Sequence, residues 1–548
     1  MLLEVTAWPN DPEGPKAKII EVLGPSGDPD TETAAILAEY GAPGPFPEAI
    51  RRAARRLERK LSPEERAGRL DLTGEICFTI DPPDARDFDD ALGLTEDPDG
   101  SLTVDVHIAD VGHYVKPGSE LDLEARDRST SIYLPERVIP MLPEEISNDA
   151  CSLRPEEDRL AKTVRLRFAP DGERLDYSIH RTLIRSRRRF AYGEVRDLLA
   201  GRDGRGASPG DDLGAKLFRL HDLAMILRQK RLDRGSIELN LTEYRVVIDA
   251  EGRAETLEKV EHDSSHQLVE EYMLAANAAL AEWAAANGLP ALHRQHPPPK
   301  EERVKELADY LTACGYPFKP PFRRDRLMAV VEKAAGRPEE HAVNLMILKS
   351  FQQASYSPDP DIGHFALDFP RYMHFTSPIR RYPDLQLHQM LDLAFAAGRE
   401  GAHKLPKKLR RLIRTGEDLE KLGGHCSSRE RRAMRIEEEV KEFRRLELLS
   451  RADGREFPAV VTSVRKFGVF VEISGYFVEG LLSRTDLAGK GRSTREELPP
   501  PARGRSAGAS RPRLAGDPGF HIGQAVKVRL IQADLATRRC QLEFLGDA

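Results

Sequence analysis

The order of apolar and polar positions divides the chain into three regions, of which the first covers residues 1–60. Two short strand-like runs, LLEVTAW and AKIIEVLG, are separated by the turn-like NDPEGP, and a helix-like stretch beginning PEAIRRAARR follows. Two strands alone do not make a stable sheet. We therefore expect these strands either to pair with later strands or to belong to a longer β-domain.

The second region, residues 61–450, has the pattern of one large unit. Strand signals such as GEICFTI and SLTVDVHIAD come first, and helical periodicity follows in SSHQLVEEYMLAANAALAEWAAA and HKLPKKLRRLIR. One linker-like stretch, the glycine-rich loop at residues 201–212, interrupts it. Strands followed by helices indicate the α+β class.

The third region, residues 451–548, predicts a separate β-domain. Apolar residues alternate with polar ones and glycines in EFPAVVTSVRKFGVFVEISGYFVEGLL and again in HIGQAVKVRLIQADL. Between these runs, residues 489–518 are rich in Gly, Pro, Ser and Arg and have no apolar period. We interpret them as a flexible basic insertion that either touches phosphates or is an ordinary solvated loop.

Composition narrows the classes of protein. The 83 Lys and Arg residues face 90 Asp and Glu, for a net charge of -7, so the chain is not a uniformly basic nucleic-acid coat and a polyanion must meet local patches. The 5 cysteines have no paired spacing and no CxxC, which is typical of reduced thiols. No apolar run approaches the roughly 18 residues of a membrane helix, and the start lacks a signal-peptide pattern. We expect a cytoplasmic protein without a membrane partner.

The segment EICFTIDPPDARDFDDAL is the most informative part of the chain, because an apolar strand runs directly into crowded acidic residues. The carboxylates are those of Asp81, Asp84, Asp87, Asp89 and Asp90. A solvated acidic turn is the ordinary interpretation, but the stiff Pro82–Pro83 pair and the interrupting Phe88 weaken it. The spacing of these acidic residues does not match that of a calcium-binding EF-hand loop. Magnesium at a phosphate site remains, because crowded carboxylates need cations and hard oxygen ligands suit that ion.

A second cluster lies far along the chain in RYMHFTSPIRRYPDLQLHQ. Its adjacent Arg380 and Arg381 follow a proline, and guanidinium groups pair bidentately with phosphate oxygens. Ordinary carboxylate bridges explain such a pair equally well, so this segment alone leaves both interpretations open.

Together, TIDPPDARDFDDAL and HFTSPIRRYPDLQLH resemble the signature blocks of the RNB exoribonucleases, the ribonuclease R and ribonuclease II group. The resemblance continues through STSIYLPERVIPMLPEEISNDACSL, HQLVEEYMLAAN and HCSSRERRAMRIEEEV, and it covers residues 71 to about 450. It implies a magnesium-dependent hydrolase that threads single-stranded RNA into a channel and releases nucleoside 5′-monophosphates from the 3′ end. It also implies that the first block is the tail of a cold-shock domain of the OB type.

The resemblance assigns roles to individual residues. It implies that Asp81, Asp87, Asp89 and Asp90 hold two magnesium ions, with Asp89 and Asp90 also catalytic, whereas Asp84 is not one of the four. Arg380 matches the arginine that fixes the scissile phosphate, and Tyr133 the tyrosine that stacks on the terminal nucleotide. Further RNA contacts are implied for Tyr192, Glu270 or Glu271, Arg381 and Glu437. Leu239 stands where the family has a base-clamping aromatic residue, so we expect weaker stacking there.

The third region resembles the S-one type OB-fold RNA-binding domain. Phe467 and Phe470 lie next to Arg465 and Lys466, which combines stacking rings with phosphate-binding charge. We expect one of the two phenylalanines to belong to the core. The basic runs RSRRR at 185–189 and KKLRRLIR at 407–414 either line an RNA path or form solvated surfaces.

The sequence therefore predicts a processive 3′-to-5′ exoribonuclease that acts on single-stranded RNA with two Mg²⁺ ions, or Mn²⁺ in their place, and no organic cofactor. Two alternatives are an RNA-binding protein with a silent catalytic centre and a metal-dependent endoribonuclease. Metal-dependent shortening of labelled RNA tests the first alternative, and cleavage of circular RNA tests the second.

Overall fold

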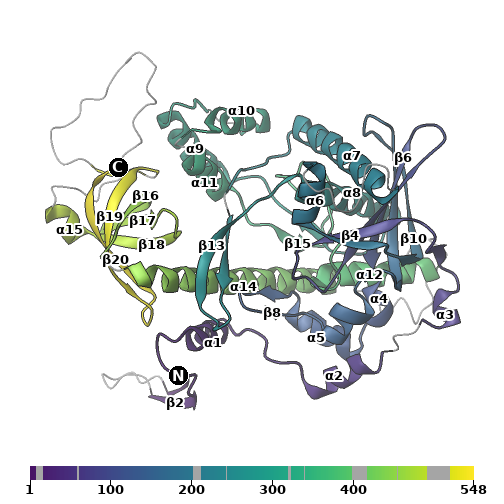
Figure 1. Cartoon of the computed structure of the whole chain (residues 1–548), viewed down its shortest axis with the longest axis horizontal. Helices are drawn as coiled ribbons and strands as arrows, with labels where there is room; N and C mark the ends of the chain where they lie inside the picture. The colour runs from purple at the N-terminus through teal and green to yellow at the C-terminus, as the bar shows by residue number, and fades with distance from the viewer. Residues whose placement is uncertain are drawn as a thin grey trace.

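Figure 1 shows the computed structural model of the chain. The structure describes residues 1–7, 16–57, 61–201, 212–241, 243–318, 322–337, 340–397, 416–452, 454–489, 519–521 and 523–548. The interpretations of residues 202–211, 407–414 and 490–518 lie outside the described residues. Among those described, no helix combines the length and the apolar character that crossing a membrane requires.

A seven-stranded sheet forms the centre of the large unit, in the order β11-β4-β5-β6-β9-β10-β3. Its strands are β3 (Leu70–Leu72), β4 (Cys77–Asp81), β5 (Asp90–Glu96), β6 (Leu102–Ala109), β9 (Asp158–Phe168), β10 (Arg174–Arg185) and β11 (Arg188–Ala191). The inner pairs are antiparallel, and the edge strands β11 and β3 pair in parallel with β4 and β10. Both faces of β4 and most of β6 are buried, which explains their nearly continuous apolar sequence.

Helices pack against this sheet and extend the unit. They are α2 (Glu48–Arg55), α3 (Pro63–Arg66), α4 (Val111–Tyr114), α5 (Glu120–Arg128), α6 (Tyr192–Leu199), α7 (Asp212–Arg234), α8 (Ser264–Ala286), α9 (Glu301–Ala313), α10 (Arg324–Ala334), α11 (Glu340–Ser350), α12 (Tyr382–Ala396) and α14 (Gly416–Leu449), with short turns of helix at Ile146–Ala150 and Ser450–Ala452. α7, α8 and α12 share one hydrophobic core with the sheet. Three strand pairs stand apart from the sheet: β7 (Ile132–Tyr133) with β8 (Val138–Ile139), β12 (Glu243–Ile248) with β13 (Ala254–Val260), and β14 (His293–Gln295) with β15 (Ser355–Ser357).

The third region is a closed β-barrel at the far end of the long helix α14 (Figure 1). Its strands are β16 (Glu456–Arg465), β17 (Gly468–Ile473), β18 (Val478–Ser483), β19 (Ala525–Asp534) and β20 (Arg539–Asp547), with helix α15 (Arg484–Gly489) after β18. Closure buries a core of alternating residues from every strand, together with Leu446 and Leu449 of α14. The predicted α+β class and the separate β-domain are confirmed.

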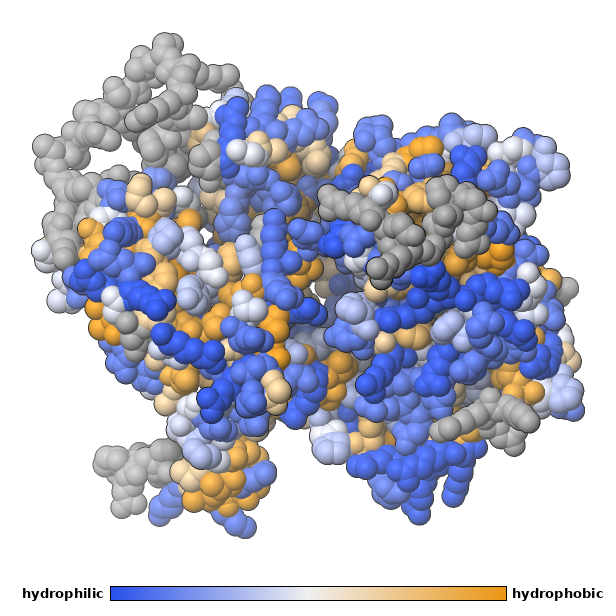
Figure 2. Space-filling model, in the orientation of Figure 1, coloured by the Kyte–Doolittle hydropathy of each residue, from blue (hydrophilic) through white to orange (hydrophobic). Residues whose placement is uncertain are grey.

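The N-terminal segment contains strands β1 (Leu2–Ala7) and β2 (Lys16–Glu21), followed by α1 (Pro29–Glu39). β1 and β2 pair only with each other in the described part of the chain, so they do not join later strands. Their apolar side chains, including Leu3, Val5, Ile19 and Ile20, are exposed, and Figure 2 shows the corresponding hydrophobic surface at the lower left. The expectation of pairing with later strands is therefore wrong for the described residues, and membership in a longer β-domain stays a prediction.

Candidate active site

The acidic segment forms the loop between β4 and β5. β4 ends at Asp81 and β5 begins at Asp90, and the strands are in antiparallel register from Cys77 opposite Gly93. Phe88 anchors the loop: its ring is buried, and its N–H donates to Ser152 Oγ at 3.1 Å. The apolar residue that interrupts the acids therefore fixes the backbone, so that the carboxylates on either side are held in place.

The loop carboxylates are buried more deeply than an ordinary acidic turn. Asp81 is 8% exposed and Asp89 5%. Asp81 Oδ2 and Asp89 Oδ2 accept no hydrogen bond from any described residue. Burial raises the pKa of Asp81 to about 6 and that of Asp90 to about 7, and it raises the pKa of Asp87 and Asp89 as well. Without a cation, this arrangement disfavours the ionised carboxylates.

Arg380 is the cation that the fold brings to these carboxylates. Its Nε lies 3.5 Å from Asp89 Oδ2, and the N–H of Ile379 donates to Asp89 Oδ1 at 3.1 Å. Arg380 Nη2 also donates to Ser377 Oγ at 2.9 Å. The side chain remains 44% exposed, so the guanidinium can still face a phosphate.

Arg381, its neighbour, is engaged elsewhere. Its Nη2 donates to Asp384 Oδ1 at 2.7 Å, and the same oxygen accepts from the N–H of Ser377 at 2.8 Å. Asp384 is fully buried. The carboxylate bridge, one of the two interpretations left open by the sequence, therefore describes Arg381. A contact between Arg381 and RNA stays a prediction.

Tyr133 reaches the same site through the segment that pairs with Arg380. Ser131 N–H donates to Arg380 O at 3.1 Å, and β7 follows directly. The N–H of Tyr133 donates to Glu437 Oε1 of α14 at 2.8 Å. Burial raises the pKa of the Tyr133 hydroxyl, while the nearby Arg380 opposes this rise and Asp87 adds to it. Among the acids in RIEEEV, Glu437 is thus the one whose carboxylate contacts the β7 backbone.

Tyr192 lies close to Asp81, on the side of β4 that pairs with β11. β11 runs parallel to β4 with Ala191 opposite Asp81, and Tyr192 is the next residue, at the start of α6. Its ring stacks on His266 of α8, with ring centroids 4.0 Å apart and an interplanar angle of 8°. His266 was missed in the sequence, although its position four residues before Glu270 places both on one face of a helix.

The two glutamates left open by the sequence differ in this structure. Glu271 is buried and forms an ion pair with Arg231, with Nη2 and Oε1 2.5 Å apart. Glu270 is partly exposed, and its Oε2 lies 3.7 Å from Nε2 of His262. Because Glu271 neutralises a buried guanidinium, Glu270 is the better candidate for a contact with RNA.

The remaining candidates lie away from this cluster. Leu239 packs against the hydrophobic cluster formed around α9, α10 and α11. Arg465, Lys466, Phe467 and Phe470 surround the tight turn between β16 and β17, where Phe467 is 59% exposed and its ring lies 6.0 Å from that of Phe470. Neither phenylalanine belongs to the core cluster of the barrel, so the expectation that one of them is core was wrong. Phe467 lies in the two-residue turn, and Phe470 alternates with the buried Val469 and Val471 along β17, so both rings are partly accessible.

The described side chains do not by themselves form a closed set of metal ligands, but their chemistry suits a metal ion. Within the described ranges, no group of three or more His, Cys, Asp or Glu side chains is gathered closely enough to hold an ion as it stands. However, the two buried oxygens without a hydrogen-bond partner and the raised carboxyl pKa values both signal a missing positive charge. Carboxylate oxygens are the ligands that hard divalent cations prefer, so the donor set fits such an ion.

Comparison with known proteins agrees with this architecture. A family model described as RNB domain matches residues 69–397, one described as Cold shock domain matches residues 1–47, and one described as S1 RNA binding domain matches residues 451–544. The RNB match covers more than half of the 548 residues. The chain therefore belongs to the RNB family, as its signature segments indicate.

Individual relatives place the chain more narrowly. It is 35% identical to Ribonuclease R of Aquifex aeolicus over 100% of this chain and 74% of that protein, and 34% identical to Ribonuclease R of Thermotoga maritima over 97% and 73%. Among solved structures it is similar to Mycoplasma genitalium RNase R in complex with ribose methylated single-stranded RNA, with a TM-score of 0.87, 25% identity and coverage of 99% and 82%. Yeast Ssd1, described as a pseudonuclease, shares the fold with a TM-score of 0.68 at 20% identity, covering 88% and 59%.

Proposed function

We propose that this chain is a 3′-to-5′ exoribonuclease that hydrolyses single-stranded RNA to nucleoside 5′-monophosphates, and its similarity to proteins named Ribonuclease R supports this proposal. The convergence of buried carboxylates, one half-exposed arginine and two tyrosines carries the proposal. These groups come from the β4–β5 loop, the Arg380 segment, β7 and α6, which lie far apart in the sequence.

Each protein group has a role in this proposal. The ring of Tyr133 stacks on the terminal base without reading its identity. The guanidinium of Arg380 pairs with the scissile phosphate and stabilises the charge that develops on it. Water attacks the phosphorus, the 3′-oxygen of the preceding nucleotide leaves, and the product keeps its 5′-phosphate.

RNB ribonucleases are metal-dependent, and we propose Mg²⁺ as the ion here. Asp81, Asp87, Asp89 and Asp90 would hold it, because burial raises the pKa of all four carboxyl groups and a bound divalent cation would favour their ionised forms. When bound, divalent ions at such a site activate water and stabilise the leaving oxygen. The cytoplasmic location stays a prediction from the sequence.

The test uses single-stranded RNA labelled at its 5′ end. With Mg²⁺ the label should move stepwise into shorter products, and excess chelator should stop the reaction. Asp89→Asn keeps the side-chain shape and the acceptor for Ile379, so RNA binding should persist while turnover falls by about 100-fold or more. Asp84→Asn is the matched control, because Asp84 is exposed in the same loop and should be replaced without loss.

Two results would contradict the proposal. The Ssd1 neighbour is described as a pseudonuclease, so the fold alone does not establish activity, and RNA that stays intact with bound protein and Mg²⁺ would indicate a silent centre. Circular RNA has no 3′ end, so its cleavage would indicate an endonuclease instead.

A further inference from the structure

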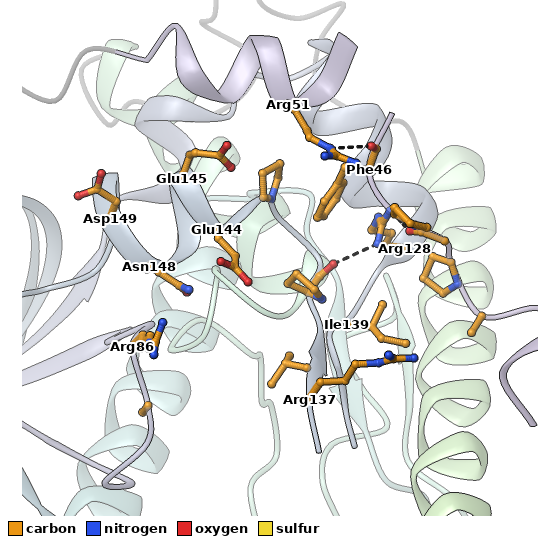
Figure 3. Close-up of a pocket in the computed structure, with 18 of the residues that line it drawn as sticks. Phe46, Arg51, Arg86, Arg128, Arg137, Ile139, Glu144, Glu145, Asn148 and Asp149 are labelled. Carbon is orange, nitrogen blue, oxygen red and sulfur yellow. Dashed lines mark hydrogen bonds between the residues drawn. The ribbon is translucent and has the colours of Figure 1, made fainter. Parts of the chain in front are cut away.

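A large cavity adjoins the candidate active site and has no part in the function proposed above. Its volume is about 1660 Å³, and it lies among the N-terminal segment, α2, the β7–β8 turn and the β4–β5 loop (Figure 3). Pockets that hold one small ligand commonly measure about 300–1,000 Å³, so this cavity has ample room for a nucleotide.

The cavity shares two of its walls with the site. On one side, its wall includes Arg86 and Phe88, the residues that flank Asp87. On the other side, it includes Val138, which is paired with Tyr133 across β7 and β8. The cavity therefore borders the candidate active site both at the β4–β5 loop and at the β7–β8 turn.

Several arginines of the cavity already have carboxylate partners. Arg55 Nε lies 3.3 Å from Glu145 Oε1, and Arg154 Nη1 lies 3.0 Å from Asp149 Oδ1. These pairs leave alternating charges on the wall. A strand of RNA needs a continuous track of unpaired cations along its phosphates, and this wall does not provide one.

Two other arginines of the lining, Arg51 and Arg189, donate to the backbone oxygens of Phe46 and Pro82. Arg86 and Arg137 differ from all of these, because neither guanidinium has a hydrogen-bond or ion-pair partner among the residues that the structure describes. Both are exposed to the cavity, and Figure 3 shows them on separate sides of it. The Glu144 carboxylate faces the same space and opposes tight retention of an anion. Ile139 and Pro140 add apolar surface on which a base can lie.

We propose that this cavity is the exit site for the nucleoside 5′-monophosphate product. The phosphate of the product is drawn out by Arg86 and Arg137 in turn, and its base contacts Ile139 and Pro140. One small dianion with a flat aromatic base matches two separate guanidiniums, some apolar surface and a nearby repelling carboxylate. The inference rests on the proposed function and adds to it a route for the product that is separate from the path of the RNA strand.

The experiment compares wild type with Arg137→Gln and Arg86→Gln, using adenosine 5′-monophosphate as the probe. Each variant should weaken inhibition by the added monophosphate about tenfold, because one charge-assisted hydrogen bond is lost. Turnover at saturating RNA should fall, whereas the rate of the first cleavage with enzyme in excess should not change. RNA affinity, measured with chelator present, should stay within about twofold.

Arg52→Gln provides the control. Arg52 is exposed on α2, a helix that lines the cavity, but its own side chain is not part of the lining. It should leave all four measurements unchanged. Calorimetric titration of the wild type with adenosine 5′-monophosphate detects the site without catalysis, so absent RNA cleavage with intact binding would count against the proposed function alone.

Three outcomes would overturn the exit site. The first is no saturable binding of adenosine 5′-monophosphate to the wild type at millimolar concentration. The second is a loss of RNA affinity in the arginine variants with inhibition by the monophosphate unchanged, which would make the cavity part of the strand path. The third is an equal loss of inhibition in Arg52→Gln, which would indicate a diffuse charge effect.

Discussion

At the scale of single residues, Arg380 and Arg381 show how adjacent identical side chains take different roles. Arg380 is half exposed beside Asp89, whereas Arg381 neutralises the fully buried Asp384. The sequence SPIRRY gives no sign of this difference, because both arginines follow the same proline. The distinction arises from the turn before α12, which points one guanidinium toward the carboxylate loop and the other into the core.

This difference predicts opposite effects for the same substitution. Arg380→Gln should lower turnover about 100-fold while leaving stability nearly unchanged, since a partly exposed pair contributes little to folding. Arg381→Gln leaves the Asp384 carboxylate buried without its cation, so unfolding should need about 3–5 kcal/mol less free energy. Urea denaturation and turnover of both variants check this, and equal destabilisation of the two would show that the assignment is wrong.

Residue chemistry was predictable where the residues are close in sequence. The five aspartates from Asp81 to Asp90 share one short segment, so their crowding was visible in the sequence, whereas the choice of four of them came from the resemblance to the RNB exoribonucleases. The choice between Glu270 and Glu271 was not visible, because it depends on Arg231, which lies 40 residues away on α7. Long-range partners of this kind leave no local pattern.

At the scale of elements, the stack between α6 and α8 orients Tyr192 beside Asp81. His266 covers one face of the Tyr192 ring, and aromatic stacks of this kind contribute about 0.5–1.5 kcal/mol beyond buried area. His266→Ala should therefore lower kcat/KM on RNA about threefold to tenfold, and His266→Phe should restore most of it. A double-mutant cycle of His266→Ala with Tyr192→Ala, which removes the ring, measures the coupling, and full additivity of the two substitutions would contradict it.

The position of α14 against β15 gives a second prediction at this scale. A Cβ on Gly423 would lie 2.5 Å from the backbone oxygen of Tyr356, whereas a Cβ on the neighbouring Gly424 meets nothing within 4 Å. Gly423→Ala must push the helix away from the strand and should cost about 1–3 kcal/mol. Gly424→Ala should instead stabilise the helix by about 0.5–1 kcal/mol. Denaturant unfolding of both variants measures these two effects. Destabilisation by Gly424→Ala would show that this face of α14 has contacts that the structure does not place there.

Element pairing was less predictable than element type. The β-run ending at Ile80 and the helical periodicity of HQLVEEYMLAAN predicted β4 and α8. The parallel pairing of β11 with β4, which places Tyr192 next to Asp81, was not predictable, because about 110 residues separate the two strands and both are short.

At the scale of the whole molecule, α14 connects the site to the barrel. It runs from the β14–β15 pair to the closed barrel, and its 34 residues span about 50 Å (Figure 1). Arg444 is completely buried near its end and donates to Gly252 O of the β12–β13 turn at 3.1 Å. Tyr244 of β12 stacks on Phe477 of the barrel, with ring centroids 3.9 Å apart. The barrel is therefore held in place relative to the β12–β13 turn and the large unit.

Because the barrel is held in place, the exposed ring of Phe467 can serve as a second contact for a long RNA strand. Phe467 is 59% exposed at the β16–β17 turn beside Arg465 and Lys466, and stacking on such a ring contributes about 1–3 kcal/mol per base. Phe467→Ala should therefore weaken binding of long single-stranded RNA about tenfold and shorten each processive run. Binding of an oligonucleotide a few nucleotides long should not change, since it cannot reach both the site and the barrel.

The matched control for this prediction is Ile531→Ala, because Ile531 is 50% exposed on β19 of the same barrel. It removes a comparable area of exposed apolar surface without touching the basic turn, so long RNA should bind as in the wild type. Fluorescence anisotropy with long and short RNA measures both variants. If Ile531→Ala weakened long RNA as much as Phe467→Ala, or if Phe467→Ala weakened short RNA equally, the effect would come from the barrel's stability rather than from stacking at the turn.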